Sequence, residues 1–148
     1  MPITPSKISA DDMNAFFLTA FEGGDKTMLP AITHASEGRV IMELAITKAM
    51  LRPGGTVSGP TQMAVADHAA YATIFTHHGV TAMALTTNLN IDFLRAPKAD
   101  SGKENIMVVD AKTIKMGRTL AVISVEMTMK GNPKLASRAT VTYAMPKS

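Results

Sequence analysis

The chain of 148 residues contains 46% hydrophobic and 18% charged side chains, and it carries a formal net charge of +3. This length suits one domain with a substantial core, and the composition excludes a largely disordered chain. Because the sequence contains no cysteine, disulfides, zinc–thiolate sites and thiol nucleophiles are excluded. We therefore expect residues 1–148 to form a single domain.

The distribution of apolar and charged residues bears on location and partners. No apolar run approaches the ~20 residues of a membrane-spanning helix, and residues 1–7 contain two prolines and no apolar core. The basic residues are spread among acidic ones, and only five Phe and two Tyr are present, which disfavours a nucleic-acid partner. We expect a cytoplasmic protein that engages neither a membrane nor a nucleic acid.

The first predicted element is a helix over about residues 10–22. Ser9 is placed as its N-cap, with Asp12 three residues later. Apolar residues then recur at the spacing of one helix face, and Gly23 and Gly24 are expected to end the helix.

A β-hairpin and a loop are predicted next. Residues 32–36 and 39–49 are expected to form two strands on either side of Glu37 and Gly38. Residues 52–59 are rich in glycine and other turn formers, so they are expected to form a loop.

Residues 60–76 are predicted to form a central helix. Pro60 suits its first turn, because the missing N–H would have no partner there, and Gly59 is expected to be the N-cap. The segment is rich in alanine and apolar on nearly every side, which is typical of a buried helix.

Four further strands are predicted. Residues 81–94 alternate as in a long half-buried strand, and residues 105–115, 118–130 and 135–144 are expected to form an antiparallel meander. The order of elements predicts an α+β fold in which a curved antiparallel sheet wraps one long helix. Such a sheet leaves an edge strand exposed, so we expect the chain to form a dimer or a tetramer.

Asp67 is the most conspicuous polar residue of the sequence. It is the only acid on the apolar central helix, and it lies too far from either end to act as a cap. Two interpretations are open: Asp67 hydrogen-bonds a neighbouring loop or subunit, or it acts as a general base or a nucleophile.

Gly59 is the second candidate catalytic residue. A glycine-rich turn that leads into a helix presents free backbone N–H groups to an oxyanion. Gly59 lies eight residues before Asp67, which corresponds to ~12 Å along a helix axis. An elongated thioester could reach both groups, particularly if the acid came from a second subunit; otherwise Gly59 only helps to cap the helix.

These features together resemble a known family. Residues 52–60 (Arg-Pro-Gly-Gly-Thr-Val-Ser-Gly-Pro), followed by Asp67, are similar to the Asn-Pro-x-Gly-x-x-His-Gly-Gly signature and downstream Asp of hot-dog-fold acyl-CoA thioesterases of the phenylacetate-pathway (PaaI-like) type. Residues 88–97 resemble that family's strand after the helix, and residues 115–120 resemble its Gly-Arg hairpin. The resemblance spans roughly residues 38–143.

The resemblance implies hydrolysis of an acyl-CoA thioester to the free acid and CoA, without any cofactor beyond the CoA of the substrate. It assigns Asp67 as the carboxylate that activates water or attacks the thioester carbonyl. It assigns Gly59 as the residue whose N–H polarises that carbonyl. It also implies a dimer in which the acid of one subunit faces the glycine turn of the other.

Three residues depart from the family signature: Arg52 replaces its Asn, Ser58 its His and Pro60 its second Gly. Arg52 is expected either to bind a substrate anion or to pair with Asp67. Ser58 can replace a hydrogen bond of the histidine without its charge, whereas Pro60 has no N–H to donate.

Other candidate substrate-binding residues follow from their positions. Thr86 and Thr87 lie on the strand expected beside the helix, where the resemblance implies a hydroxyl that orients water. Arg95, Lys98 and Arg118 are candidate contacts for the phosphates of CoA.

Two alternatives to hydrolysis stay open. Enoyl-CoA hydratases of the same fold resemble one another in pairing the Asp with a His a turn or so later, but Ala72 occupies that position here. A non-catalytic acyl-CoA-binding protein is the other alternative, because the signature's Asn and His are missing. His77 and His78 lack a third ligand at a recognisable spacing, so no metal site is predicted.

Overall fold

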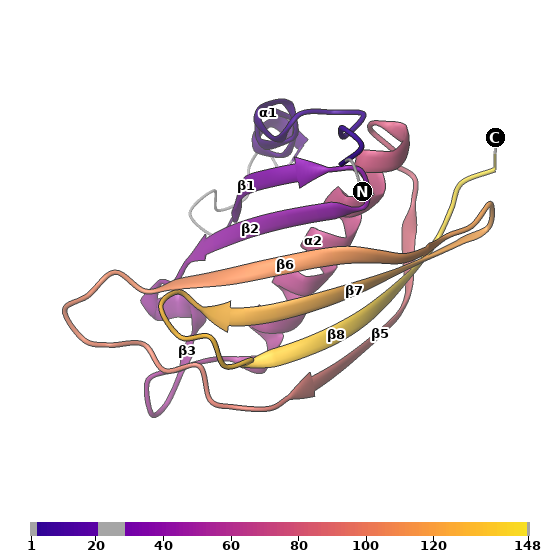
Figure 1. Cartoon of the computed structure of the whole chain (residues 1–148). Coiled ribbons are helices and arrows are strands. Elements are labelled where there is room, and N and C mark those ends of the chain that lie inside the picture. The colour runs from indigo at the N-terminus through magenta and orange to yellow at the C-terminus, as the bar shows by residue number, and fades with distance from the viewer. Residues whose placement is uncertain (1–2, 21–28, 148) are drawn as a thin grey trace.

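The computed structural model describes residues 3–20 and 29–147. One long helix, α2 (Gly59–His78), packs on one face of a six-stranded antiparallel sheet (Figure 1). The strands lie in the order β1 (Ala31–Ser36), β2 (Arg39–Ala45), β6 (Ile106–Met116), β7 (Leu120–Met129), β8 (Ser137–Ala144) and β5 (Leu85–Phe93). This arrangement confirms the predicted α+β fold. In the described part of the chain, no helix has the length and apolar character to cross a membrane.

The N-terminal helix α1 (Ala10–Ala20) lies beside the first hairpin (Figure 1). The Ser9 hydroxyl accepts a hydrogen bond from Asp12 N at 3.1 Å, which confirms the predicted cap. The Asn14 side chain binds both the N (2.8 Å) and the O (3.0 Å) of Ile32 in β1, so it fixes the helix to the sheet edge. The predicted helix end at residues 21–24 lies outside the described residues.

The β1–β2 hairpin turns at Glu37 and Gly38, as predicted. β2 ends at Ala45 and not at residue 49, because the chain turns into a 3₁₀ helix, η2 (Lys48–Met50). The stretch predicted as a loop contains a small hairpin of β3 (Leu51–Arg52) and β4 (Thr56–Val57). Its turn places Gly54 and Gly55 at φ of 99° and 75°, a conformation that glycine adopts without steric cost.

The central helix α2 runs two residues beyond its predicted end, and its N-cap is Ser58 instead of Gly59. Ser58 Oγ accepts a hydrogen bond from Thr61 N at 3.3 Å, and Gly59 and Pro60 occupy the first turn. A serine hydroxyl satisfies one of the free N–H groups of a first turn, which glycine has no side chain to do. Gly79, at φ 80°, ends the helix.

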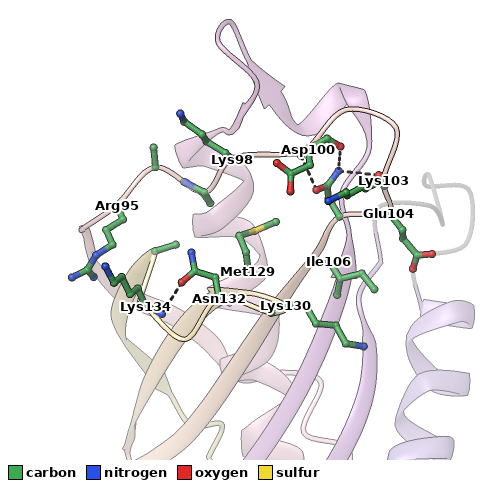
Figure 2. Close-up of a pocket in the computed structure, with 15 residues that line it drawn as sticks. Arg95, Lys98, Asp100, Lys103, Glu104, Ile106, Met129, Lys130, Asn132 and Lys134 are labelled. Atoms are coloured by element: carbon green, nitrogen blue, oxygen red, sulfur yellow. Dashed lines mark hydrogen bonds between the residues drawn. The ribbon is translucent and has the colours of Figure 1, made fainter.

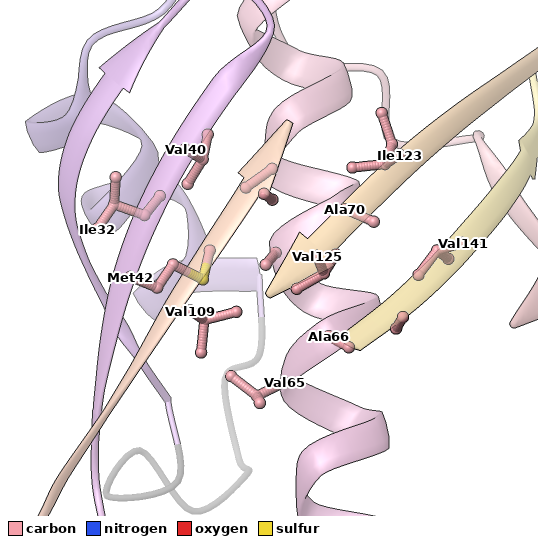
Figure 3. Packing of buried hydrophobic residues seen from close by; sticks show 14 of the residues in the cluster. Ile32, Val40, Met42, Val65, Ala66, Ala70, Val109, Ile123, Val125 and Val141 are labelled. Atoms are coloured by element: carbon pink, nitrogen blue, oxygen red, sulfur yellow. The ribbon is translucent and has the colours of Figure 1, made fainter. Parts of the chain in front are cut away.

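The hydrophobic core lies between α2 and the sheet. Alternate residues of the four inner strands point toward the helix (Figure 3), among them Val40, Val109, Val125 and Val141. The helix contributes Ala66, Ala69 and Ala70 to this core, and all three are 0% exposed. These small side chains let the sheet approach closely, so a larger residue there would cost about 1–3 kcal/mol through overpacking.

β5 forms an edge of the sheet. It begins at Leu85 instead of residue 81, and within the described chain it pairs only with β8. The half-buried character predicted for this strand is wrong for the single chain: Leu85 is 63% exposed and Phe93 is 52% exposed. An edge strand lacks the second neighbour that would cover its side chains. The next three strands, β6, β7 and β8, form the predicted meander.

Candidate active site

Asp67 is a half-buried residue of α2 whose side chain meets two strands. Its Oδ1 accepts a hydrogen bond of 2.7 Å from Thr86 Oγ1 of β5 and another of 2.7 Å from the Tyr143 hydroxyl of β8. No described residue hydrogen-bonds Oδ2. One carboxylate oxygen is therefore fixed by two donors, and the other can meet water or a substrate.

Tyr143 is a site residue that the sequence did not indicate. Its hydroxyl also lies 3.0 Å from the backbone O of Asp67. Burial raises the pKa of Tyr143 far above its ordinary value, and the nearby Asp67 carboxylate raises it further. The phenol therefore stays protonated and remains a hydrogen-bond donor. A tyrosine in an alternating strand is typical of a core residue, so only the packing of β8 on α2 reveals this role.

A β-bulge in β5 directs Thr86, and not Thr87, toward Asp67. Thr86 pairs with Tyr143, and the next pair joins Asn88 to the neighbouring residue of β8, so Thr87 is the extra residue. Because successive side chains of a strand point to opposite faces, this one insertion places Thr86 on the helix side of the sheet. Thr87 Oγ1 donates instead to a backbone carbonyl of β8 at 3.3 Å. Of the two predicted threonines, Thr86 joins the site and Thr87 does not.

Gly59 lies at the wall of a different pocket, which has a volume of ≈ 540 Å³. A Cβ at Gly59 would come within 3.3 Å of Cζ of Phe93, so a larger residue would have to displace this ring. Arg52 and Arg95 line the same pocket, and Asp67 does not. Within one chain, the two predicted catalytic residues therefore face different spaces.

The predicted basic contacts fall into two groups. Arg95 and Lys98 line one pocket beyond the end of β5, whereas Arg118 lies in the β6–β7 turn at the opposite end of the sheet (Figure 1). The structure therefore brings the first two together and separates Arg118 from them in the single chain. Ser58 lies near the Gly59 pocket, but its hydroxyl is engaged in capping α2.

His68 and His77 make structural contacts. His68 packs against the Phe17 ring with centroids 4.5 Å apart, and burial lowers its pKa to about 4, so it is neutral near physiological pH. His77 Nε2 lies 2.8 Å from Thr113 Oγ1. Residues 3–20 and 29–147 contain no group of three side chains that could hold a metal ion.

Comparison with known proteins adds to this geometry. The sequence profile of the thioesterase superfamily matches residues 54–136. No curated protein matches the chain. Among solved structures, a candidate thioesterase from Silicibacter sp. TM1040 is 34% identical; the match covers 97% of this chain and 95% of that chain, with a TM-score of 0.80.

Two other solved structures are more distant in sequence. The E. coli PaaI protein from the phenylacetic acid degradation operon is 18% identical, with 92% of this chain and 93% of that chain covered and a TM-score of 0.75. A hypothetical thioesterase from Streptococcus pneumoniae TIGR4, solved with coenzyme A, is also 18% identical, with coverage of 81% and 90% and a TM-score of 0.69. At these identities the likeness concerns the fold, and it confirms the predicted hot-dog architecture.

Proposed function

Because this chain belongs to the thioesterase superfamily and is thus a thioester hydrolase, we propose that it hydrolyses an acyl-CoA thioester to the free acid and CoA. The arrangement of Asp67 carries this proposal, since two hydroxyl donors hold Oδ1 and leave Oδ2 for the reaction. The related fold that was solved with coenzyme A supports CoA as the thiol component. The chemistry needs no cofactor beyond the CoA of the substrate.

The reaction forms a C–O bond at the thioester carbonyl and breaks the C–S bond. Asp67 either takes a proton from an attacking water or attacks the carbon through Oδ2 to give an anhydride that water then opens. In both routes water supplies the new oxygen of the acid, and the departing thiolate takes up a proton. The oxyanion is stabilised by the N–H of Gly59, because this group belongs to the first helical turn and has no intrahelical acceptor.

A second copy of the chain completes the site in this proposal. Gly59 and Asp67 are separated by ~12 Å along the axis of α2, too far to surround one carbonyl from within one chain. The exposed edge of β5, with apolar residues such as Leu85 and Phe93, offers a surface for pairing with the same strand of another copy. Such pairing would bring Asp67 of one copy opposite the Gly59 turn of the other.

Arg52 is proposed to bind a substrate anion. It is exposed, it lines the pocket at Gly59, and it forms no ion pair with Asp67 or with any other described carboxylate. Ser58 supports the site indirectly, because its cap fixes the start of α2. Arg118 can contribute to the same substrate only from another copy, given its place at the opposite end of the sheet.

The proposal is tested by measuring free thiol released from short, medium, long and aryl acyl-CoAs. We expect turnover of at least one ester, and a loss of at least ~10³-fold in Asp67→Asn. The amide can still accept hydrogen bonds from Thr86 and Tyr143, so the fold is retained, but it cannot act as a base or a nucleophile. Asp11→Asn, which neutralises an exposed acid of α1, is the matched control.

Other outcomes select the alternatives. Undiminished turnover in folded Asp67→Asn would remove this residue from the mechanism. Tight binding of acyl-CoAs without release of thiol would select a non-catalytic binding protein. Addition of water to an enoyl-CoA would select a hydratase.

A further inference from the structure

Gln62 is a buried polar residue near the start of α2, three residues after Gly59. It is only 3% exposed, and it lines the same pocket as Gly59. The side-chain Nε2 donates a hydrogen bond to Val57 O of β4 at 3.2 Å. Because Val57 precedes Gly59 and Gln62 follows it, this bond restricts how the turn at Gly59 can move.

The main chain of Gln62 fixes the peptide group that carries the N–H of Gly59. Gln62 N donates to Ser58 O at 3.2 Å, so the Ser58 carbonyl points along α2 into the helix. The C=O and the N–H of a trans peptide point in opposite directions. The N–H of Gly59 therefore points away from the helix, toward the side from which a thioester carbonyl could approach.

The strand that Gln62 binds is itself held in place. Val57 N donates to Pro97 O at 3.0 Å, and Ser58 N donates to Met50 O at 2.8 Å. These two contacts hold the end of β4 from different sides. The side-chain bond of Gln62 therefore joins α2 to a strand with a fixed position.

Two loops fix the segment that follows β5 and binds β4 (Figure 2). Asn105 closes the loop on one side, since its side chain accepts a hydrogen bond from Asp100 N at 2.9 Å and donates one to Asp100 O at 3.1 Å. On the other side, Arg95 N donates to Ala136 O of the β7–β8 turn at 3.1 Å. Arg95 also lines one pocket with Lys134 of that turn. The segment therefore gives β4 a fixed edge.

The amide of Gln62 contributes less to stability than its bond to Val57 suggests. Its Oε1 is buried, and no described residue donates a hydrogen bond to this atom. A buried acceptor without a donor is destabilising, which offsets the gain from the bond at Nε2. Methionine would fill a similar volume without the unpaired oxygen. The stability of the fold alone therefore does not account for a glutamine at this position.

We infer that Gln62 is a positioning residue, which directs the N–H of Gly59 toward the oxyanion that forms from the thioester. This inference rests on the proposed function, because it takes Gly59 as the oxyanion donor. Gln62 acts without touching the substrate carbonyl: it holds the two peptide groups that lead into the helix, and so aligns the donor before charge develops on the oxygen. Such alignment stabilises the transition state more than the bound substrate.

The test compares Gln62→Met with Thr73→Val in steady-state hydrolysis of the best acyl-CoA. Gln62→Met keeps the packing but removes the donor to Val57 O, so we expect kcat to fall about 10-fold and KM to change less than about 2-fold. Thr73→Val also removes a buried side-chain hydrogen bond from α2, the 2.7 Å bond to Ala69 O, but far along the helix from Gly59. It should keep the parent kcat. Both variants should retain a Tm within about 5 °C of the parent.

A second variant relates the effect to the hydrogen bond itself. In Gln62→Glu the protonated carboxyl can donate to Val57 O, whereas the ionised carboxylate has no hydrogen to donate. Burial raises the pKa of such a carboxyl, so it takes up a proton as the pH falls. The kcat of Gln62→Glu, divided by that of the parent at each pH, should therefore rise at least about 3-fold between about pH 8 and about pH 5.5. The division removes the titration of Asp67, which both proteins share.

Three results would overturn the inference. One is an unchanged kcat in Gln62→Met. Another is a Gln62→Met chain that fails to fold while Thr73→Val folds, since the amide would then serve stability. The third is a ratio for Gln62→Glu that does not change with pH.

The positioning role and the proposed hydrolysis can be told apart when they fail. Each of the three results leaves the hydrolysis in place as long as the parent protein releases thiol. A parent protein that releases no thiol from any acyl-CoA would remove the hydrolysis, and the role of Gln62 with it.

Discussion

The Tyr143 hydroxyl donates to Oδ1 of Asp67 at 2.7 Å, the same oxygen that accepts the hydrogen bond from Thr86. Two donors on one oxygen prevent the carboxylate from turning, so Oδ2 keeps a defined direction. Hydrogen bonds to a charged group contribute about 1.5–3 kcal/mol each, enough to change a rate by one to two orders of magnitude.

Removal of the phenol should slow the chemical step. Tyr143→Phe keeps the ring and its packing but loses the donor, and we expect kcat to fall about 10- to 100-fold with little change in KM. Tyr71→Phe is the control, because this ring stacks on Tyr143 but its hydroxyl donates to Ala82 O and not to Asp67. Steady-state kinetics on the best acyl-CoA decide the matter, and equal kcat in both variants would contradict the role of Tyr143.

The β-bulge predicts opposite effects for two neighbouring threonines. Thr86→Val removes the second donor to Asp67 and should lower kcat by about 10-fold or more. Thr87→Val should leave the kinetics near those of the parent, because its hydroxyl contacts only a backbone carbonyl of β8. A larger loss in Thr87→Val than in Thr86→Val would show that β5 adopts the other register in solution.

A site shared between copies predicts complementation. Asp67→Asn and Gly59→Pro should each be inactive alone, the latter because proline has no N–H to donate and because its ring adds atoms where a Cβ already comes within 3.3 Å of Phe93. Mixed dimers contain one site with both groups intact, so random mixing of the two variants should restore about a quarter of the parent activity. Mixed dimers that form, as shown by native mass spectrometry, and stay inactive would contradict the shared site.

Substitution of Arg52 should affect binding more than chemistry. Arg52→Ala is expected to raise KM about 5-fold with kcat nearly constant, because a contact with a remote anion is made equally in ground and transition states. Lys48→Ala removes an exposed charge from nearby η2 as a control. A fall in kcat without a change in KM would place Arg52 beside the reacting groups instead.

His68 should make stability depend on pH. Burial lowers its pKa from 6.5 to about 4, so between these values the unfolded chain binds the proton more readily than the folded one. The free energy of unfolding should therefore fall as pH falls from 6.5 toward 4, by up to about 3 kcal/mol. Urea unfolding of His68→Gln should lack this part of the slope, whereas His78→Gln, at an exposed position, should retain it.

The sequence alone predicted the elements that follow regular patterns. The alternation in β6, β7 and β8 and the apolar character of α2 come from burial on one side or on all sides, so they are visible without coordinates. Asp67 also stood out in the sequence, because it is an acid in an otherwise apolar helix. Ser58 replaced Gly59 as the cap because a hydroxyl in the preceding residue satisfies the first turn better.

Features that depend on how strands pair or where loops meet could not be predicted. The bulge at Thr87 is a relation between β5 and β8, and it decides which threonine faces the helix. Tyr143 acquires its role from the residue opposite it, and the grouping of Arg95 with Lys134 depends on where two loops meet. A linear pattern contains no signal for any of these.

Because β5 lies at the edge of the sheet, it should be locally less stable than the other elements that carry site residues. β8, which carries Tyr143, has a hydrogen-bonded strand on each side, whereas β5, which carries Thr86, has one hydrogen-bonded neighbour in the described chain. Amides of β5 should therefore exchange with solvent through local opening, and those of β7 only with the whole fold. Each opening separates Thr86 from Asp67 while the core stays folded. A partner strand on this edge would slow that exchange. Assembly would therefore also keep Thr86 beside Asp67 for a larger fraction of the time.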